Sequence, residues 1–197
     1  MQVSAVKAEL RRLCLLRRKA VPLDAARDFA ARLASEVPTV LAGAARDGTI
    51  PVISAYWPIR DEADSRPLLA ALAELGVTTA LPVTGGRGHP LVFRAWKPGD
   101  AQNPGQMAIP EPLSTAAQVE PDVLFVPLAA FDRRGHRIGY GAGHYDCTLA
   151  QLRAKKPVVA IGIAFATQEI AEVPSEPHDQ KLDFVLTERE LIDCRNI

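Results

Sequence analysis

Short, continuously apolar segments recur along the chain, and such segments are typical of strands that are buried on both faces of a sheet. Stretches with helical periodicity or clusters of turn residues separate them. The pattern predicts strands over residues 52–57, 81–83, 91–96, 123–126, 158–163 and 184–186. Because strands alternate with helices, we expect one α/β domain over residues 1–197. Its architecture would be three-layered, with a mostly parallel sheet and helices on both faces.

The N-terminal segment has the periodicity of an amphipathic helix. Its apolar side chains recur at three- and four-residue steps, at Val3, Val6, Leu10, Leu13 and Cys14. At about 100° per residue, Lys7, Arg11 and Arg18 lie in one row along the edge of this stripe. Three interpretations remain open. They are a solvated basic face, a mitochondrial transit peptide, which Glu9 and the few serines disfavour, and a helix edge that presents cations to an anionic ligand.

Capping and terminating residues locate the next two helices. Asp24 is the expected N-cap of a helix over residues 24–36. A third helix would begin at Asp64 or Ser65 and end at Gly76.

The stretch over residues 98–121 holds five of the sixteen prolines and shows no clear periodicity. We expect a long ordered loop here. Loops of this length are often functional.

Composition narrows the class of protein without identifying its function. The chain has 23 basic and 23 acidic residues, and its net charge of zero argues against nucleic-acid binding through bulk positive charge. No apolar run reaches the ~18 residues of a membrane span. The cysteines Cys14, Cys147 and Cys194 form no CxxC pair, which favours a reducing cytoplasmic location over a disulfide-bonded scaffold.

Four of the thirteen glycines lie within nine residues, just before a predicted helix over residues 144–155: Gly135, Gly139, Gly141 and Gly143. Glycines let backbone N–H groups approach a ligand, and a helix start adds unpaired N–H groups and the positive end of a dipole. Together these features suit a phosphate. Arg134 and Arg137 could supply charge, and Asp146 could hold a divalent cation. The segment matches neither a Walker loop nor a dinucleotide fingerprint, and a tight glycine turn without a ligand remains an alternative.

This segment and several others resemble the 5-formyltetrahydrofolate cyclo-ligase family, the methenyltetrahydrofolate synthetases. The strongest motif is a strand ending in proline, a Phe-Asp pair, a glycine, and a run that here reads Arg137-Ile-Gly-Tyr-Gly-Ala-Gly-His-Tyr-Asp146. The other matching segments are Lys7-x-x-x-Arg11, Tyr56-Trp57 through Glu62, Leu81-Pro82, Glu111-Pro112, Gln168, His178-Asp179 and Leu182-Asp183. Their order and spacing cover nearly the whole chain, which makes the resemblance specific.

The resemblance implies an ATP- and Mg²⁺-dependent enzyme that closes a ring in 5-formyltetrahydrofolate. ATP would phosphorylate the formyl oxygen, and N10 of the folate would attack the activated carbon and expel phosphate. The products would be 5,10-methenyltetrahydrofolate, ADP and phosphate. Such a reaction needs alignment and charge stabilisation more than an acid–base pair. We expect a monomer that binds ATP and the folate, and neither nucleic acid nor a membrane.

The resemblance also implies roles for individual residues. The expected ATP-binding residues are Lys7, Arg11, Arg137, Gly139, Tyr140, Gly141, Ala142, Gly143, His144 and Tyr145. The expected folate-binding residues are Trp57, Glu62, Met107, Tyr140 and His144. Asp146 and Asp179 would bind Mg²⁺, while Arg137 and Tyr145 would act directly in the reaction. The Glu62 carboxylate suits the amino and ring N–H donors of a pterin.

Three positions depart from the family pattern: Ala142 stands where glycine or lysine is usual, His144 where an aromatic residue is usual, and Cys147 where arginine is frequent. Ala142 must have a negative φ or be strained. Arg153 is a candidate to replace the missing arginine. These differences keep open a family member that binds nucleotide or folate without turnover. A hydrolytic metal site, and a CoA-transferase-like or sugar-phosphate enzyme on a similar scaffold, are weaker alternatives, because no matching motif is present.

Overall fold

The computed structural model describes residues 3–35, 50–105 and 108–195. Met107, one of the expected folate-binding residues, lies outside these ranges, and so does the last residue of the helix expected over residues 24–36. No described helix has the length and apolar character needed to cross a membrane.

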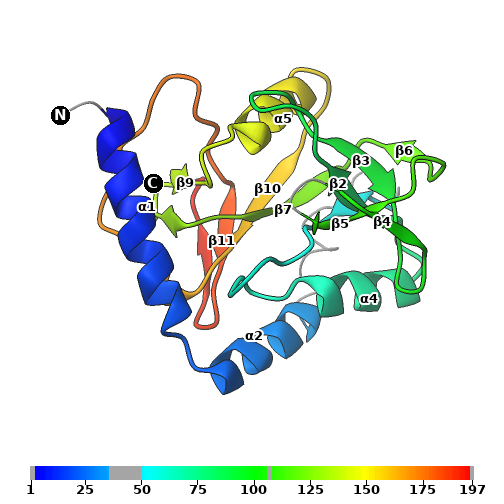
Figure 1. The fold of residues 1–197 in the computed structure, drawn as a ribbon, viewed down its shortest axis with the longest axis horizontal. Coiled ribbons are helices and arrows are strands. Elements are labelled where there is room, and N and C mark those ends of the chain that lie inside the picture. Colours follow the sequence, from blue (N-terminus) through cyan, green and yellow to red (C-terminus); the bar gives the residue numbers. More distant parts are fainter. Residues whose placement is uncertain (1–2, 36–49, 106–107, 196–197) are drawn as a thin grey trace.

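The centre of the molecule is an eight-stranded sheet with the strand order β12-β11-β10-β7-β1-β2-β3-β6 (Figure 1). The strands are β1 (Ile53–Ser54), β2 (Thr79–Val83), β3 (Val92–Ala95), β6 (Gln118–Val119), β7 (Val123–Pro127), β10 (Val159–Ile163), β11 (Phe184–Leu186) and β12 (Leu191–Asp193). The five neighbouring strands from β11 to β2 run parallel. β12, β3 and β6 are antiparallel to their neighbours. The expected α/β class with a mostly parallel sheet is therefore confirmed.

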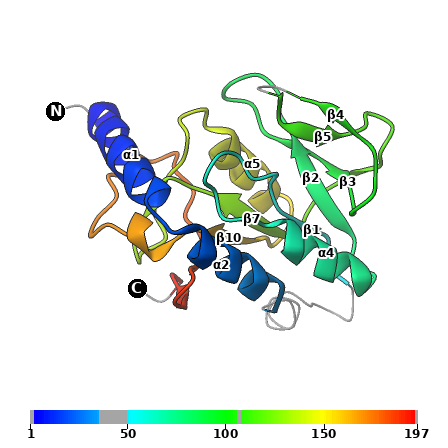
Figure 2. The same ribbon diagram turned by 60° about the horizontal axis from the view of Figure 1, so that its bottom comes forward.

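Helices cover both faces of the sheet, because the two parallel crossovers run in opposite directions along it (Figure 2). α4 (Arg66–Glu74) connects β1 to β2, whereas α5 (His144–Arg153) connects β7 to β10 on the other side of β1. Right-handed crossovers that diverge in this way place their helices on opposite faces. α2 (Leu23–Ser35) packs beside α4. The expected three-layer arrangement is thus confirmed.

Two apolar cores fill the layers on either side of the sheet. Alternate residues of β7 point to opposite faces, so that Val123 and Phe125 belong to one core and Leu124 and Val126 to the other. The first core packs the sheet against α2 and α4, and the second packs it against α5. Burial on both faces explains why these strands read as continuous apolar runs.

The helix caps differ in part from expectation. α2 begins one residue before Asp24, so Asp24 lies in the first turn and is not the N-cap. Its carboxylate still lies at the positive end of the helix dipole. Ser65 is the N-cap of α4, but its hydroxyl donates to the Tyr56 carbonyl oxygen. The Asp64 carboxylate accepts the hydrogen bond from the Arg66 amide N–H instead.

The proline-rich stretch 98–121 contains short strands that the sequence pattern did not predict. Its strands β4 (Gln102–Pro104) and β5 (Pro110–Pro112) form an antiparallel pair, and β5 packs beside β2. These strands were not predicted, because strands this short carry no periodic signal and prolines interrupt them. The hairpin of β8 (Ala130–Phe131) and β9 (Arg137–Ile138) escapes prediction because its strands are equally short.

α1 (Val3–Lys19) lies at one end of the molecule, beside β8 and the short helix η2 (Ala166–Gln168) (Figure 1). Cys14 is buried against this part of the chain. The cationic edge of α1 also faces the interior, because the Lys7 and Arg18 side chains are only 12% and 2% exposed. The interpretation of a solvated basic face is therefore wrong for these two residues.

Candidate active site

A cavity of about 620 Å³ lies at the carboxyl ends of three parallel strands. Trp57 follows β1, Thr84 follows β2 and Pro127 ends β7, and all three residues line the cavity. The two crossovers diverge between β1 and β7, and in open α/β sheets the crevice outside such a switch point is the usual ligand site. α1 contributes Lys7 and Arg11 to the same cavity.

Every expected site residue within the described ranges lines this cavity. These residues are Lys7, Arg11, Trp57, Glu62, Arg137, Gly139, Tyr140, Gly141, Ala142, Gly143, His144, Tyr145, Asp146 and Asp179. Arg134 is different, and the expectation that it adds charge to the anion site is wrong. It pairs with Asp132 and Glu172, each at 3.1 Å, and is not part of the cavity wall.

The glycine-rich segment forms one wall of the cavity. Gly141 and Gly143 have φ angles of 92° and 74°, which residues with a side chain rarely adopt. Gly143 is the N-cap of α5 and has no side chain to occupy the first amide N–H groups of the helix. Arg11 Nε donates to the Gly139 carbonyl oxygen at 2.6 Å, and no described carboxylate pairs with its guanidinium. Free N–H groups, a helix dipole and an arginine together suit a phosphate.

Arg137 is buried at the edge of the cavity and joins two distant segments of the chain. Its Nη2 donates to Asp146 Oδ1 at 2.7 Å, and its Nη1 donates to the Gln180 carbonyl oxygen. The backbone N–H of Gln180 donates to the same Asp146 oxygen at 3.0 Å. Burial lowers the pKa of Arg137, and the negative charge of Asp146 opposes this effect. Within the described ranges, Asp146 Oδ2 accepts no hydrogen bond.

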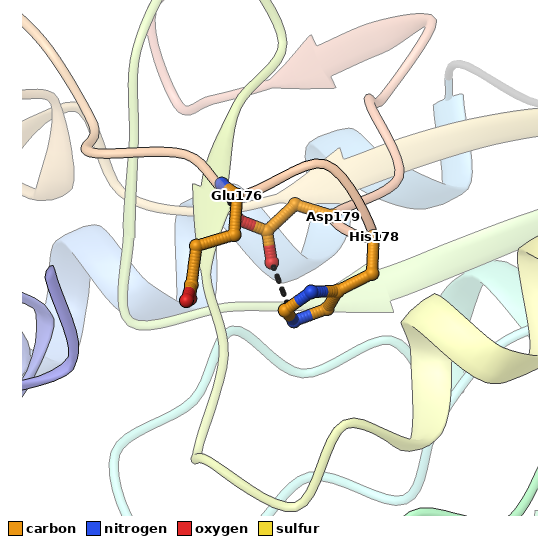
Figure 3. A group of neighbouring side chains, drawn as sticks. All are labelled: Glu176, His178 and Asp179. Atoms are coloured by element: carbon orange, nitrogen blue, oxygen red, sulfur yellow. Dashed lines mark hydrogen bonds and ion pairs between the residues drawn. The ribbon is translucent and has the colours of Figure 1, made fainter.

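Glu176, His178 and Asp179 lie close together on the segment that faces α1 (Figure 3). Lys7 Nζ pairs with Glu176 at 2.9 Å and with Asp179 Oδ2 at 2.5 Å. Burial alone would raise the pKa of Asp179, but the hydrogen bond from Lys7 lowers it below its usual value. Asp179 Oδ1 has only a 3.8 Å contact with His178 Nε2 among the described residues. Lys7 is thus already ion-paired, in contrast to Arg11.

A second part of the cavity wall, beside the glycine-rich loop, holds Trp57 and the buried Glu62 carboxylate. Trp57 packs edge-on against Trp96, with ring centroids 5.8 Å apart. The Glu62 side chain is 4% exposed, and its oxygens accept hydrogen bonds from the Tyr140 hydroxyl and, at 2.8 Å, from the Ile59 N–H. Burial raises the pKa of Glu62, and these hydrogen bonds oppose the rise. Each oxygen can accept a further hydrogen bond, so this wall suits a flat heterocycle with N–H donors.

A model of the 5-formyltetrahydrofolate cyclo-ligase family matches residues 3–188. This chain belongs to that family. It is 36% identical over 188 residues to the 5-formyltetrahydrofolate cyclo-ligase of Mycolicibacterium smegmatis, which covers 92% of this chain and 93% of that protein. The Haemophilus influenzae 5-formyltetrahydrofolate cyclo-ligase is 32% identical over 143 residues, covering 68% and 74% of the two chains. The NMR structure of the Aquifex aeolicus 5,10-methenyltetrahydrofolate synthetase matches with a TM-score of 0.74 and 25% identity, covering 98% and 94%.

The three positions at which this cyclo-ligase departs from the family pattern are accommodated locally. Ala142 has no positive φ, so the glycine-rich loop is not strained there. Cys147 and His144 each contact a backbone carbonyl oxygen of the turn that precedes β3, at 3.3 and 3.0 Å. Arg153 does not replace the missing arginine, because it pairs with Asp183 at 2.9 Å and is not part of the cavity wall.

Sequence reasoning missed Glu111 and Glu176, which also line the cavity. Glu111 Oε1 accepts hydrogen bonds from the Thr84 backbone N–H at 2.9 Å and from its hydroxyl at 2.5 Å. A Cβ on Gly105 would lie 2.2 Å from the Glu111 carboxyl carbon, so a side chain there would displace the Glu111 carboxylate from this position. Glu111 belongs to a dipeptide that carried the resemblance, and Glu176 stands three residues before Asp179. Their places beside these motif residues were the only signals in the sequence that could have identified Glu111 and Glu176 as site residues.

Proposed function

We propose that this cyclo-ligase converts 5-formyltetrahydrofolate and ATP into 5,10-methenyltetrahydrofolate, ADP and phosphate. The observation that carries the proposal is one cavity in which a wall suited to a phosphate meets a wall suited to a pterin. Arg11 and the glycine-rich loop form the first wall, and Trp57 and Glu62 form the second. A reaction between ATP and a folate requires both to be held side by side in a fixed orientation.

The chemistry is a phosphoryl transfer followed by a ring closure. The formyl oxygen attacks the γ-phosphorus of ATP, and ADP departs. N10 then attacks the formyl carbon, the bond from this carbon to the phosphate oxygen breaks, and N10 loses its proton. Phosphate is a good leaving group, whereas the oxygen of an amide is a poor one. The enzyme mainly has to align the groups and balance their charges.

Arg11 and the N–H groups at the start of α5 hold the phosphates, and Arg137 and Tyr145 act on the reacting groups. Arg137 is fixed by Asp146 and by the Gln180 carbonyl oxygen, so its charge is in place before the reaction begins. Burial raises the pKa of Tyr145, which keeps its hydroxyl protonated and able to donate a hydrogen bond. The contacts of Arg137 support a role in positioning and charge stabilisation.

Asp146 and Asp179 are the residues that we propose to hold Mg²⁺. Each carboxylate has one oxygen bound to a cation, Arg137 or Lys7, and a second oxygen that accepts no hydrogen bond within the described ranges. Carboxylate oxygens are the protein ligands that Mg²⁺ prefers, so these residues fit the ion. When bound, Mg²⁺ supplies positive charge that neutralises the phosphate oxygens.

The pterin would lie against Trp57, with its N–H groups donating to Glu62. Tyr140 and His144 border the glycine-rich loop and also line the cavity, so they can contact the folate beside the nucleotide. Cys14, Cys147 and Cys194 form no disulfide. Free thiols agree with the cytoplasmic location that we propose, and we propose that the enzyme acts as a monomer.

The direct test mixes the protein with Mg-ATP and 5-formyltetrahydrofolate and follows the absorbance of the methenyl product. Product formation in step with ADP release is expected. Binding of nucleotide or folate in a calorimeter without product would instead indicate a family member that has lost turnover. The relaxed backbone of Ala142 and the local contacts of His144 and Cys147 give no structural reason for such a loss.

Arg11→Ala is expected to raise the KM for ATP about tenfold to a hundredfold, because it removes a charged donor to phosphate. The KM for the folate should change much less. Arg12→Ala is the matched control on the same helix, since Arg12 is exposed and, among the residues that the structure describes, pairs with Glu9 alone, at 2.7 Å. Steady-state kinetics with each substrate varied in turn measures both constants. Equal increases in the two KM values would mean that Arg11 has a structural role.

A further inference from the structure

Arg18 belongs to the same row of cations as Lys7 and Arg11, but it is not part of the cavity wall. Its side chain is only 2% exposed. The guanidinium lies between α1, the segment that follows β1 and the glycine-rich loop, because it contacts residues of both segments. A buried charge is costly unless it is paired and hydrogen-bonded. The partners of Arg18 therefore indicate its role.

The guanidinium of Arg18 is held in a defined plane. Its Nε and Nη2 donate to the two carboxylate oxygens of Asp61, at 3.1 and 3.2 Å. This fork-shaped pairing fixes the orientation of the group. The remaining nitrogen, Nη1, donates to the Tyr140 hydroxyl oxygen at 2.5 Å and lies 3.9 Å from Glu62 Oε1.

These contacts also determine the direction of the hydrogen bond between Tyr140 and Glu62. A guanidinium can only donate, so the Tyr140 oxygen accepts from Arg18 and its own proton must point elsewhere. That proton is donated to Glu62 Oε1. The other oxygen of Glu62 accepts the Ile59 N–H at 2.8 Å. Glu62 is thus held at both oxygens where it lines the cavity.

We propose that Arg18 is a positioning residue for the folate, which orients Glu62 through Tyr140 and keeps the Glu62 carboxylate ionised. The proposal rests on the proposed function, in which Glu62 accepts hydrogen bonds from the pterin. Arg18 itself does not touch the substrate. A fixed, ionised carboxylate is a stronger acceptor for N–H groups than a mobile or protonated one.

The groups around Glu62 define how its charge depends on pH. They are Arg18 from α1, Tyr140 from the glycine-rich loop, Tyr145 from α5, and Tyr56 and Asp61 from the segment after β1. Burial raises the pKa of Glu62, the hydrogen bond from Tyr140 and the charge of Arg18 lower it, and Asp61 raises it. Without Arg18, the charge of Asp61 is no longer balanced, so the pKa of Glu62 rises further. Folate affinity is lost as the pH falls through this pKa, and the loss would therefore begin at a higher pH.

The test compares Arg18→Met with the wild-type enzyme by steady-state kinetics over a range of pH. We expect the KM for the folate to rise about tenfold, with smaller changes in kcat and in the KM for ATP. The acid limb of log(1/KM) for the folate should move to higher pH. Arg18→Lys keeps the charge, but lysine cannot reproduce the guanidinium's simultaneous hydrogen bonds to Asp61 and Tyr140. It should therefore raise the KM for the folate and leave the acid limb of the pH profile near its wild-type position. Arg12→Met is the control on the exposed side of α1.

A double-mutant cycle with Glu62→Gln isolates the route of the effect. If Arg18 acts through Glu62, adding Arg18→Met to Glu62→Gln does not raise the folate KM further. Neither the single Glu62→Gln variant nor the double variant should then show the fall in log(1/KM) for the folate at low pH. Additive effects, or equal rises in both KM values without a moved limb, would overturn the proposal and make Arg18 structural. An unchanged folate KM in Glu62→Gln would also overturn it, while turnover by the wild-type enzyme in the same assay would leave the ligase activity standing. If Arg18→Met does not fold, the cycle is run with Arg18→Lys.

Discussion

Asp146→Asn is expected to lower kcat by about a thousandfold or more while the protein keeps its fold. Both hydrogen bonds to the Asp146 side chain, from Arg137 at 2.7 Å and from the Gln180 N–H at 3.0 Å, end on Oδ1. Asparagine can keep an oxygen in this place, but it loses the negative charge and carries an NH2 donor where Asp146 has Oδ2. Because we propose that this charge holds Mg²⁺, the variant should lose its dependence on the metal. Initial rates of product formation at increasing Mg²⁺ concentration measure the effect.

Asp146→Ala provides the structural comparison for the asparagine variant. It removes both hydrogen bonds and leaves the buried Arg137 guanidinium without a carboxylate, which should cost about 3 kcal/mol in the free energy of unfolding. Thermal unfolding of the three proteins separates this loss from the loss of turnover. Wild-type turnover and Mg²⁺ dependence in Asp146→Asn would contradict a metal site at this residue, and Asp146 would then serve only as the partner of Arg137.

Gly135→Ala is expected to lower the free energy of unfolding by about 4 kcal/mol. Gly135 has a φ of 83°, and a Cβ there would lie 2.4 Å from the Leu182 carbonyl oxygen. The two backbones cannot easily separate, because the Leu182 N–H donates to the Gly135 carbonyl oxygen at 2.9 Å. Strain and steric overlap therefore act together. Urea-induced unfolding followed by circular dichroism gives the change in free energy.

Gly139→Ala is the matched control for stability within the same segment. Gly139 has no positive φ, and a Cβ there would meet no other atom within 4 Å. We expect its free energy of unfolding to change by less than about 1 kcal/mol. A similar loss in both variants would mean that the overlap with Leu182 is not the cause.

The contact between Gly135 and Leu182 also has a consequence for the site. Gly135 stands two residues before Arg137, and Leu182 stands two residues after Gln180. The paired backbones bring the Gln180 carbonyl oxygen to the Arg137 guanidinium. A glycine outside the cavity thus supports the geometry of the proposed metal and phosphate site.

Sequence patterns predicted the sheet well where strands are long and buried on both faces. β7 and β10 are examples, because burial makes them continuous apolar runs. The strand expected over residues 52–57 is only Ile53–Ser54 in the structure. The apolar run continues beyond the strand because Ala55 is still part of the core and Tyr56 and Trp57 line the cavity. Residues that line a ligand pocket can be as apolar as residues in the core, so the sequence pattern does not distinguish the two.

The pairing of charges was not predictable from the sequence. Lys7, Arg11 and Arg18 look equivalent on a helical projection, yet the structure gives them three different environments. Lys7 pairs with Glu176 and Asp179, Arg11 faces the glycine-rich loop, and Arg18 is buried against Asp61. The helical periodicity shows that these three side chains leave the helix on the same side, but only the tertiary structure determines which group each of them contacts.

The sequence by itself determined the fold class, the family and the glycine-rich segment that we propose to bind phosphate. Apolar periodicity reports burial, and glycine reports special backbone geometry, so both can be read locally. Only the tertiary structure decided which cations are free for a ligand and which are already paired. The reason is that the partners of Lys7 stand 169 and 172 residues away along the chain, and local sequence cannot encode which of many acidic residues the fold brings to a given cation.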